Sequence, residues 1–332
     1  MFVSYKDSSV RLTGRWDTAN ESYAETTTTG AYIEFAFEGR DALVCFDVDE
    51  NAVPFSHLWI QLDGGDMFEC PLDAYLRVSA KEDGRHVCRI IYKSSVEEFS
   101  RWYAPRHGKV SFMGVKVDKP CPIEPDDRMT IEFVGDSITE GVLIDVDYSC
   151  TGRPRYDIDQ CNRPYQDDVC ATYAWLTAER LGLRPIFMGY GGVGTTKGGA
   201  GRVPMACEAY PYNFDLSPIT HRADVILINH GANDGYRTAE RYIEGYERLL
   251  DVVRALNPTA LIVSLSAFYG KYHEELGAFI AEYNAKHSCD VRFIDSFGWI
   301  PETPIHPLRD GHRTVADNLT PLLKSIIESR FS

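Results

Sequence analysis

The stretch IEFVGDSITEG, residues 131–141, predicts a strand, a turn and a helix, with a reactive serine where the strand ends. Its first half continues an apolar, β-branched run that starts at Met129 and indicates a buried strand. The strand pattern stops at Gly135, and a turn and a helix are expected next. Ser137 would then lie at the carboxyl edge of a sheet, beside the unpaired N–H groups of a helix start. A hydroxyl beside such donors suits attack on an acyl group, although an isolated serine here would also fit a helix cap.

Three further blocks follow this stretch along the chain. Residues 189–194 read GYGGVG, residues 231–234 read GAND, and residues 306–312 read HPLRDGH. Together with Gly-Asp-Ser at 135–137, these blocks resemble the SGNH, or GDSL-type, hydrolase superfamily in both order and spacing, over about residues 129–328. The resemblance implies an α/β fold in which a three-layer α/β/α domain with a parallel sheet carries a serine esterase site.

The resemblance also implies roles for individual residues. Ser137 is the implied nucleophile, and the oxyanion donors are the backbone N–H groups of Ser137 and Gly194 with the Asn233 amide. Gly189 stands where the superfamily usually has asparagine, so Gly192 is the alternative glycine donor. The same loop fits the dinucleotide pattern G-x-G-x-x-G, but a poor helix start follows it. We therefore expect no organic cofactor and no metal.

The histidine block leaves the base and its acid open. His306 and the proline after it match the superfamily's His-Pro pair, which makes His306 the expected base. Thr303 stands where the usual aspartate would be, three residues earlier. A Ser–His dyad oriented by a backbone carbonyl and a triad with Glu302 as the acid are equally favoured. A third arrangement uses Asp310 as the acid and His312 as the base.

The chain ahead of these blocks has an all-β pattern. Strand-like runs such as 31–37 and 42–48 recur between Gly, Asp and Asn turns, which predicts a jelly-roll-like β-sandwich over residues 1–118. The Pro-rich, charged stretch 119–128 is expected to be a linker to a catalytic domain at 129–332. A β-sandwich ahead of an SGNH domain is similar to the family-two carbohydrate esterases, which deacetylate plant polysaccharides.

The last predicted helix, residues 311–328, has an apolar face at helical spacing. We expect its core residues to be Val315, Leu319, Leu322 and Ile326.

Composition excludes several classes of partner. The 332 residues are 44% hydrophobic and 25% charged, as in globular proteins, and a net charge of −15 argues against nucleic acid or an anionic membrane as partner. No apolar run reaches the ~18–20 residues of a membrane span. The N-terminus lacks a signal-peptide pattern, so a cytoplasmic location is expected. The polar insertion 148–168 is expected to cover the active-site mouth or to contact another subunit of a homo-oligomer.

The sequence thus predicts a serine esterase that forms an acyl-enzyme. By resemblance, its substrate is a short acyl ester, foremost acetyl, on a carbohydrate or small molecule. Two other functions stay open. A lysophospholipase or thioesterase of the same superfamily would need an apolar channel for a long chain. A catalytically silent carbohydrate-binding protein is favoured only by the missing acid.

Overall fold

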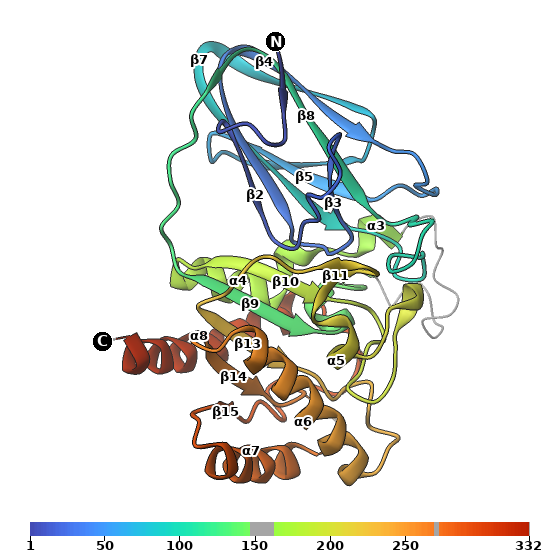
Figure 1. Ribbon diagram of the computed structural model, residues 1–332, viewed down its shortest axis with the longest axis vertical. Coiled ribbons are helices and arrows are strands. Elements are labelled where there is room, and N and C mark those ends of the chain that lie inside the picture. The colour runs from blue at the N-terminus through green and yellow to red at the C-terminus, as the bar shows by residue number, and fades with distance from the viewer. Residues whose placement is uncertain (147–162, 269–271, 332) are drawn as a thin grey trace.

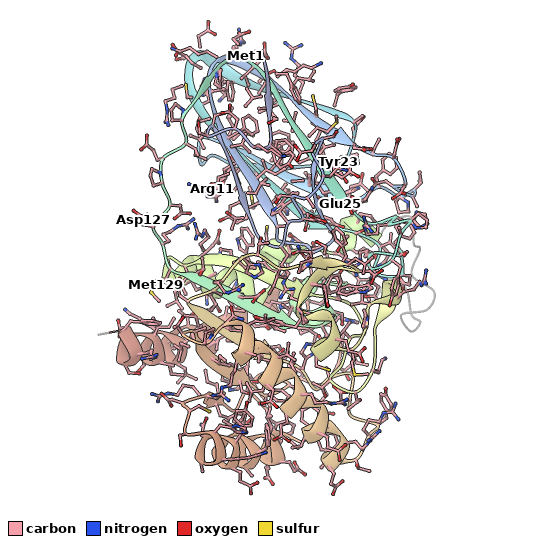
Figure 2. All side chains as sticks on the ribbon, viewed as in Figure 1. Met1, Arg11, Tyr23, Glu25, Asp127 and Met129 are labelled. Carbon is pink, nitrogen blue, oxygen red and sulfur yellow. The ribbon has the colours of Figure 1, made fainter. Side chains whose placement is uncertain are left out.

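The computed structural model describes residues 1–146, 163–268 and 272–331, and two units lie end to end in it (Figure 1). The N-terminal unit is built from antiparallel strands and the C-terminal unit from a parallel sheet with helices. The chain passes from one to the other along one side of the molecule, where Asp127 and Met129 lie (Figure 2). The parallel α/β architecture predicted from the sequence is confirmed.

The N-terminal strands are joined in one eight-stranded sheet, in the order β1-β8-β4-β7-β5-β6, with β2 on β4 and β3 on β8. Their bounds are β1 Phe2–Ser4, β2 Val10–Thr13, β3 Ala24–Thr26, β4 Tyr32–Asp47, β5 His57–Leu62, β6 Met67–Pro71, β7 Tyr75–Ser94 and β8 Val110–Cys121. The predicted runs 31–37 and 42–48 are the two halves of β4. Gly39, with a φ of 126°, lies where the pairing with β7 shifts register, so the strand bends there without ending.

The connection between the units is shorter than predicted. Strand β8 continues through Cys121, with Lys119 paired to Glu38 and Cys121 to Ala36, so the irregular segment begins at residue 122 rather than 119. Pro120 is tolerated there because β4 alone of the described strands pairs with β8 at that level. Arg11 of β2 donates to the backbone oxygen of Glu124 at 2.7 Å, which holds the segment against the N-terminal unit.

The C-terminal sheet has five parallel strands in the order β10-β9-β13-β14-β15. They are β9 Thr130–Gly135, β10 Arg184–Gly189, β13 Val225–Asn229, β14 Leu261–Leu265 and β15 Arg292–Ile294. The described helices are α1 Ser137–Glu140, α3 Arg163–Gln166, α4 Tyr173–Leu181, α5 Ala206–Ala209, α6 Ala239–Leu256, α7 His273–His287 and α8 Arg309–Phe331. Shorter elements are η3 Val169–Ala171, η4 Ala200–Arg202 and the ribbon β11 Tyr212–Phe214 with β12 Ser217–Pro218. In the described part of the chain, no helix has the length and apolar content to cross a membrane.

Helices cover both faces of this sheet. Successive residues of each strand point to opposite faces, so one strand contributes side chains to two cores. Ile131 and Phe133 of β9 belong to a core cluster with α4 and α8, while Val134 belongs to another with α5, α6 and α7. In α8 the buried residues are His312, Val315, Ala316, Leu319 and Leu323, and Leu322 is 45% exposed. The expected core position of Leu322 was therefore wrong by one residue, since the buried face advances by four residues per turn here.

Buried contacts join the two units at strand β9, which lies between β10 and β13. Arg15, in the segment after β2, is 1% exposed, and its Nε donates to Oε1 of Glu132 on β9 at 2.9 Å. Tyr210 and His221 also hydrogen-bond the Glu132 carboxylate, at 2.8 and 3.0 Å. Burial alone would raise the pKa of Glu132, but the charges of Arg15 and His221 hold it well below its usual value.

Register brings the predicted blocks together. Gly135, the last residue of β9, is paired with Gly189 on β10 and with Asn229 on β13. The three strands therefore end at the same level, and the segments that follow them meet at one carboxyl edge of the sheet.

Candidate active site

Ser137 begins the one-turn helix α1, directly after the sharp turn that follows strand β9. Asp136 is the N-cap, and its Oδ1 accepts the N–H of Ile138 at 3.0 Å. A Cβ on Gly135 would lie 2.1 Å from Oγ1 of Thr139, so the turn requires glycine at that position. Ser137 is thus the first helical residue, with its backbone N–H among the unpaired donors of the helix start.

His306 contacts the Ser137 hydroxyl directly. Its Nε2 is 2.9 Å from Oγ of Ser137, although the two residues are 169 positions apart. The His306 and Ser137 residues are only 3% and 6% exposed. A neutral imidazole at this distance can accept the hydroxyl proton as the hydroxyl attacks.

Neither candidate acid hydrogen-bonds the histidine that it was expected to orient, which is His306 for Glu302 and His312 for Asp310. Glu302 lies on an exposed segment, and its carboxylate forms no hydrogen bond or ion pair with any described residue. The Asp310 side chain is 92% exposed and pairs with Arg313 at 2.9 Å. Asp295, after β15, accepts from Ser266 and from the N–H of Phe297, both at 3.0 Å, as a turn-bracing residue would.

His312 occupies a different place from His306. It is fully buried in α8, and its Nδ1 accepts the N–H of Tyr173 at 3.1 Å. Because Tyr173 is the first residue of α4, His312 satisfies a backbone donor that the helix leaves unpaired. Burial lowers the pKa of His312 to about 3, so its ring is neutral across the physiological range. This arrangement suits a residue that joins two helices.

The Asn233 amide reaches the nucleophile turn. Its Nδ2 donates to Oδ2 of Asp136 at 3.1 Å and to the backbone oxygen of Val193 at 3.0 Å. Asn233 follows β13 and is half-buried, so it joins the turn before Ser137 to the glycine loop after β10. An oxyanion beside Ser137 would compete with these two acceptors for an amide proton. Burial raises the pKa of the Asp136 carboxyl to about 7, and the nearby Asp234 acts in the same direction.

The glycine loop is fixed from behind by Asp234, a residue for which the sequence predicted no role. Its buried carboxylate accepts the N–H groups of Thr195 and Thr196, each at 3.0 Å. A Cβ on Gly194 would lie 2.7 Å from this carboxylate, which excludes a side chain there. The Gly194 N–H donates to the backbone oxygen of Lys197 at 3.0 Å, within the loop itself. Gly192, the alternative donor, has a φ of 72°. In the sequence, only the position of Asp234 directly after Asn233 indicated that it could have a role near the site.

Most of the predicted insertion 148–168, including Cys150 and Cys161, lies outside the described residues. Its described end contains Arg163, a buried residue that pairs with Glu97 at 3.5 Å and with Asp167 at 3.3 Å. Within the described ranges, no group of three or more His, Cys, Asp or Glu could hold a metal ion.

The parallel α/β fold, together with the serine and histidine in contact at its carboxyl edge, defines the class of the protein as a carboxylic ester hydrolase. The chain belongs to the GDSL-like lipase/acylhydrolase family, whose sequence model matches residues 133–314.

Known proteins are similar to this chain well beyond the matched region. An acetylxylan esterase / glucomannan deacetylase from Cellvibrio japonicus is 24% identical over 265 residues, which are 74% of this chain and 68% of the relative. A family two carbohydrate esterase from the same organism superposes with a TM-score of 0.80 at 20% identity, covering 99% of this chain and 98% of the other. A family two carbohydrate esterase from Clostridium thermocellum, in complex with cellohexaose, gives 0.77 at 20% identity, covering 96% and 99%. These structural likenesses extend over both units.

Proposed function

We propose that this protein removes short acyl groups, foremost acetyl, from esterified carbohydrates. The observation that carries the proposal is the 2.9 Å contact between Oγ of Ser137 and Nε2 of His306, beside the Asn233 amide. The name of the Cellvibrio japonicus relative, an acetylxylan esterase / glucomannan deacetylase, supports acetyl esters of polysaccharides as the substrate class. The bound cellohexaose of the Clostridium thermocellum structure supports an oligosaccharide as the carrier.

In the proposed mechanism, Ser137 attacks the ester carbonyl while His306 accepts its proton. His306 then donates that proton to the departing sugar hydroxyl, and an acyl-enzyme forms on Ser137. Water, deprotonated by His306, hydrolyses this intermediate and releases the acid. The N–H of Ser137 and the Asn233 amide stabilise the oxyanion, with Gly194 or Gly192 as the glycine donor.

The site favours a Ser–His dyad over either predicted triad. Glu302 and Asp310 both have exposed carboxylates, and Asp310 is already paired with Arg313. Orientation of the imidazole by a backbone carbonyl fixes the tautomer without adding a buried charge.

Acyl-chain preference tests this function against its rivals. We expect kcat/KM for p-nitrophenyl acetate to exceed that for the octanoate ester, and acetate to be released from acetylated xylo-oligosaccharides. Preference for octanoate would favour the lysophospholipase or thioesterase alternative. No turnover of either ester, together with measurable binding of oligosaccharides in calorimetry, would favour the silent binding protein.

Asn233→Ala is expected to lower kcat for p-nitrophenyl acetate by about 10²- to 10³-fold, because one oxyanion donor is lost. KM should change little, since the interaction strengthens only in the transition state. Asn257→Ala is the matched control. Asn257 is buried at the opposite edge of the sheet, where it donates to the Tyr210 hydroxyl at 2.9 Å, so its loss should leave kcat intact. Equal kcat for wild type and Asn233→Ala would remove Asn233 from the oxyanion site.

A further inference from the structure

The loop between β7 and β8, residues 95–109, packs directly against residues 189–201 of the C-terminal unit. This segment begins with the glycine loop, residues 189–194. The N–H of Arg101 donates to the backbone oxygen of Gly201 at 3.2 Å. The Trp102 and Tyr190 rings meet edge to face, with 6.2 Å between centroids. A Cβ on Gly201 would lie 2.4 Å from the backbone oxygen of Phe99, so no side chain fits between the two loops. The N-terminal unit therefore packs against one side of the glycine loop.

A chain of buried polar contacts runs from this loop to the nucleophile helix. The Arg101 guanidinium forms an ion pair with Oε1 of Glu140, and Oε2 of the same carboxylate accepts the N–H of Gly191 at 2.7 Å. Glu140 lies in α1, one helical turn after Ser137. Gly191 precedes Gly192 and Gly194, the two candidate oxyanion glycines. One carboxylate thus fixes the distance between the nucleophile and the glycine loop.

Burial makes this carboxylate dependent on Arg101. The side chains of Arg101 and Glu140 are 0% and 2% exposed, so water cannot solvate either charge. Burial raises the pKa of Glu140, while the Arg101 charge opposes that rise. Arg101 also lies over the Tyr190 ring, 5.2 Å from its centroid, and Tyr190 is the residue before Gly191. Without the guanidinium, the carboxylate would be left uncompensated in a closed interface.

We propose that Arg101 is a positioning residue for the reaction, which acts through Glu140 to hold the glycine loop in register with Ser137. The N-terminal unit would then complete the active site rather than only recruit substrate. This inference rests on the proposed ester hydrolysis for its kinetic readout, but the position of the loop can be measured without it.

The test compares Arg101→Met with Arg15→Met. Arg15 is an equally buried arginine that also pairs across the two units, but its partner is Glu132 inside the sheet. For Arg101→Met we expect kcat on p-nitrophenyl acetate to fall about 10- to 100-fold with KM within about threefold, because small misplacements of reacting groups are costly. Amide hydrogen exchange in the peptide around Gly191 should become faster. Arg15→Met should retain kcat and the slow exchange at Gly191.

A double variant, Arg101→Met with Glu140→Gln, separates positioning from misfolding. The introduced glutamine amide keeps a carbonyl for the Gly191 N–H and removes the uncompensated charge, so kcat and slow exchange should recover relative to Arg101→Met. The proposal is overturned if Arg15→Met and Arg101→Met lose kcat equally, or if exchange at Gly191 is the same in Arg101→Met as in wild type. It is also overturned if the folded double variant recovers neither property. An inert wild type would refute the ester hydrolysis, and exchange at Gly191 would still decide whether Arg101 holds the loop.

Discussion

Ser137→Ala is expected to lower kcat for p-nitrophenyl acetate by about 10⁴- to 10⁶-fold, the loss typical of a missing serine nucleophile. The substitution removes the hydroxyl that lies 2.9 Å from Nε2 of His306. End-point assays at high enzyme concentration measure the residual kcat of the variant. Mass spectrometry after acid quenching detects a trapped acetyl-enzyme. Wild type should carry a transient mass increase of one acetyl group, and the variant should not.

Stability separates this role from the helix-cap interpretation of the same residue. The N-cap of α1 is Asp136, so loss of the Ser137 hydroxyl should leave the free energy of unfolding nearly unchanged. Thr172→Ala is the matched control, because Thr172 caps α4 with its hydroxyl. That variant should lose about 1 kcal/mol of stability and keep its activity. A stable Ser137→Ala protein with wild-type turnover would rule out Ser137 as the nucleophile.

The second large effect is expected at His306, where alanine should lower kcat by about 10⁴-fold or more. No other described imidazole contacts the Ser137 hydroxyl, so no described histidine can take over as base. Activity against p-nitrophenyl acetate over a range of pH measures the loss.

His312→Ala provides the contrast with His306→Ala. Its ring accepts a backbone N–H at 3.1 Å and is fully buried, so its loss should cost about 1–3 kcal/mol of stability while kcat stays within about tenfold. Urea unfolding and the same esterase assay measure both quantities. A stable but inactive His312→Ala protein beside an active His306→Ala protein would instead establish the Asp310–His312 frame.

The sequence was informative where function depends on the ends of strands. An apolar run followed by a turn signal identifies a strand and its carboxyl end, and parallel strands bring those ends to one edge. The pairing of Gly135 with both Gly189 and Asn229 is the structural form of that expectation. Order and spacing of the blocks therefore suffice to predict that Ser137, Asn233 and the glycine loop lie in one region.

Contacts between distant segments could not be predicted from the sequence in this way. Arg101 and Glu140 belong to different units, and neither lies in a pattern that periodicity or turn chemistry can detect. Helical spacing alone also could not choose between Leu322 and Leu323, because both fit an apolar face and only packing against the sheet decides. The contact between the rings of Trp102 and Tyr190, which are 3% and 1% exposed, likewise joins segments far apart in the sequence.

The ion pair between Arg15 and Glu132 has a consequence for how the protein is made. Glu132 lies 117 positions after Arg15, in β9 of the second sheet. During synthesis N-terminal domains fold first, so the cation is already in place when the strand bearing its partner emerges. A gene cut within residues 122–129 would instead yield a second half in which the buried Glu132 carboxylate keeps its contacts with Tyr210 and His221 but loses the charge of Arg15. A new N-terminal module joined to this hydrolase would therefore restore the native charge balance at Glu132 where it supplies a cation at the same point.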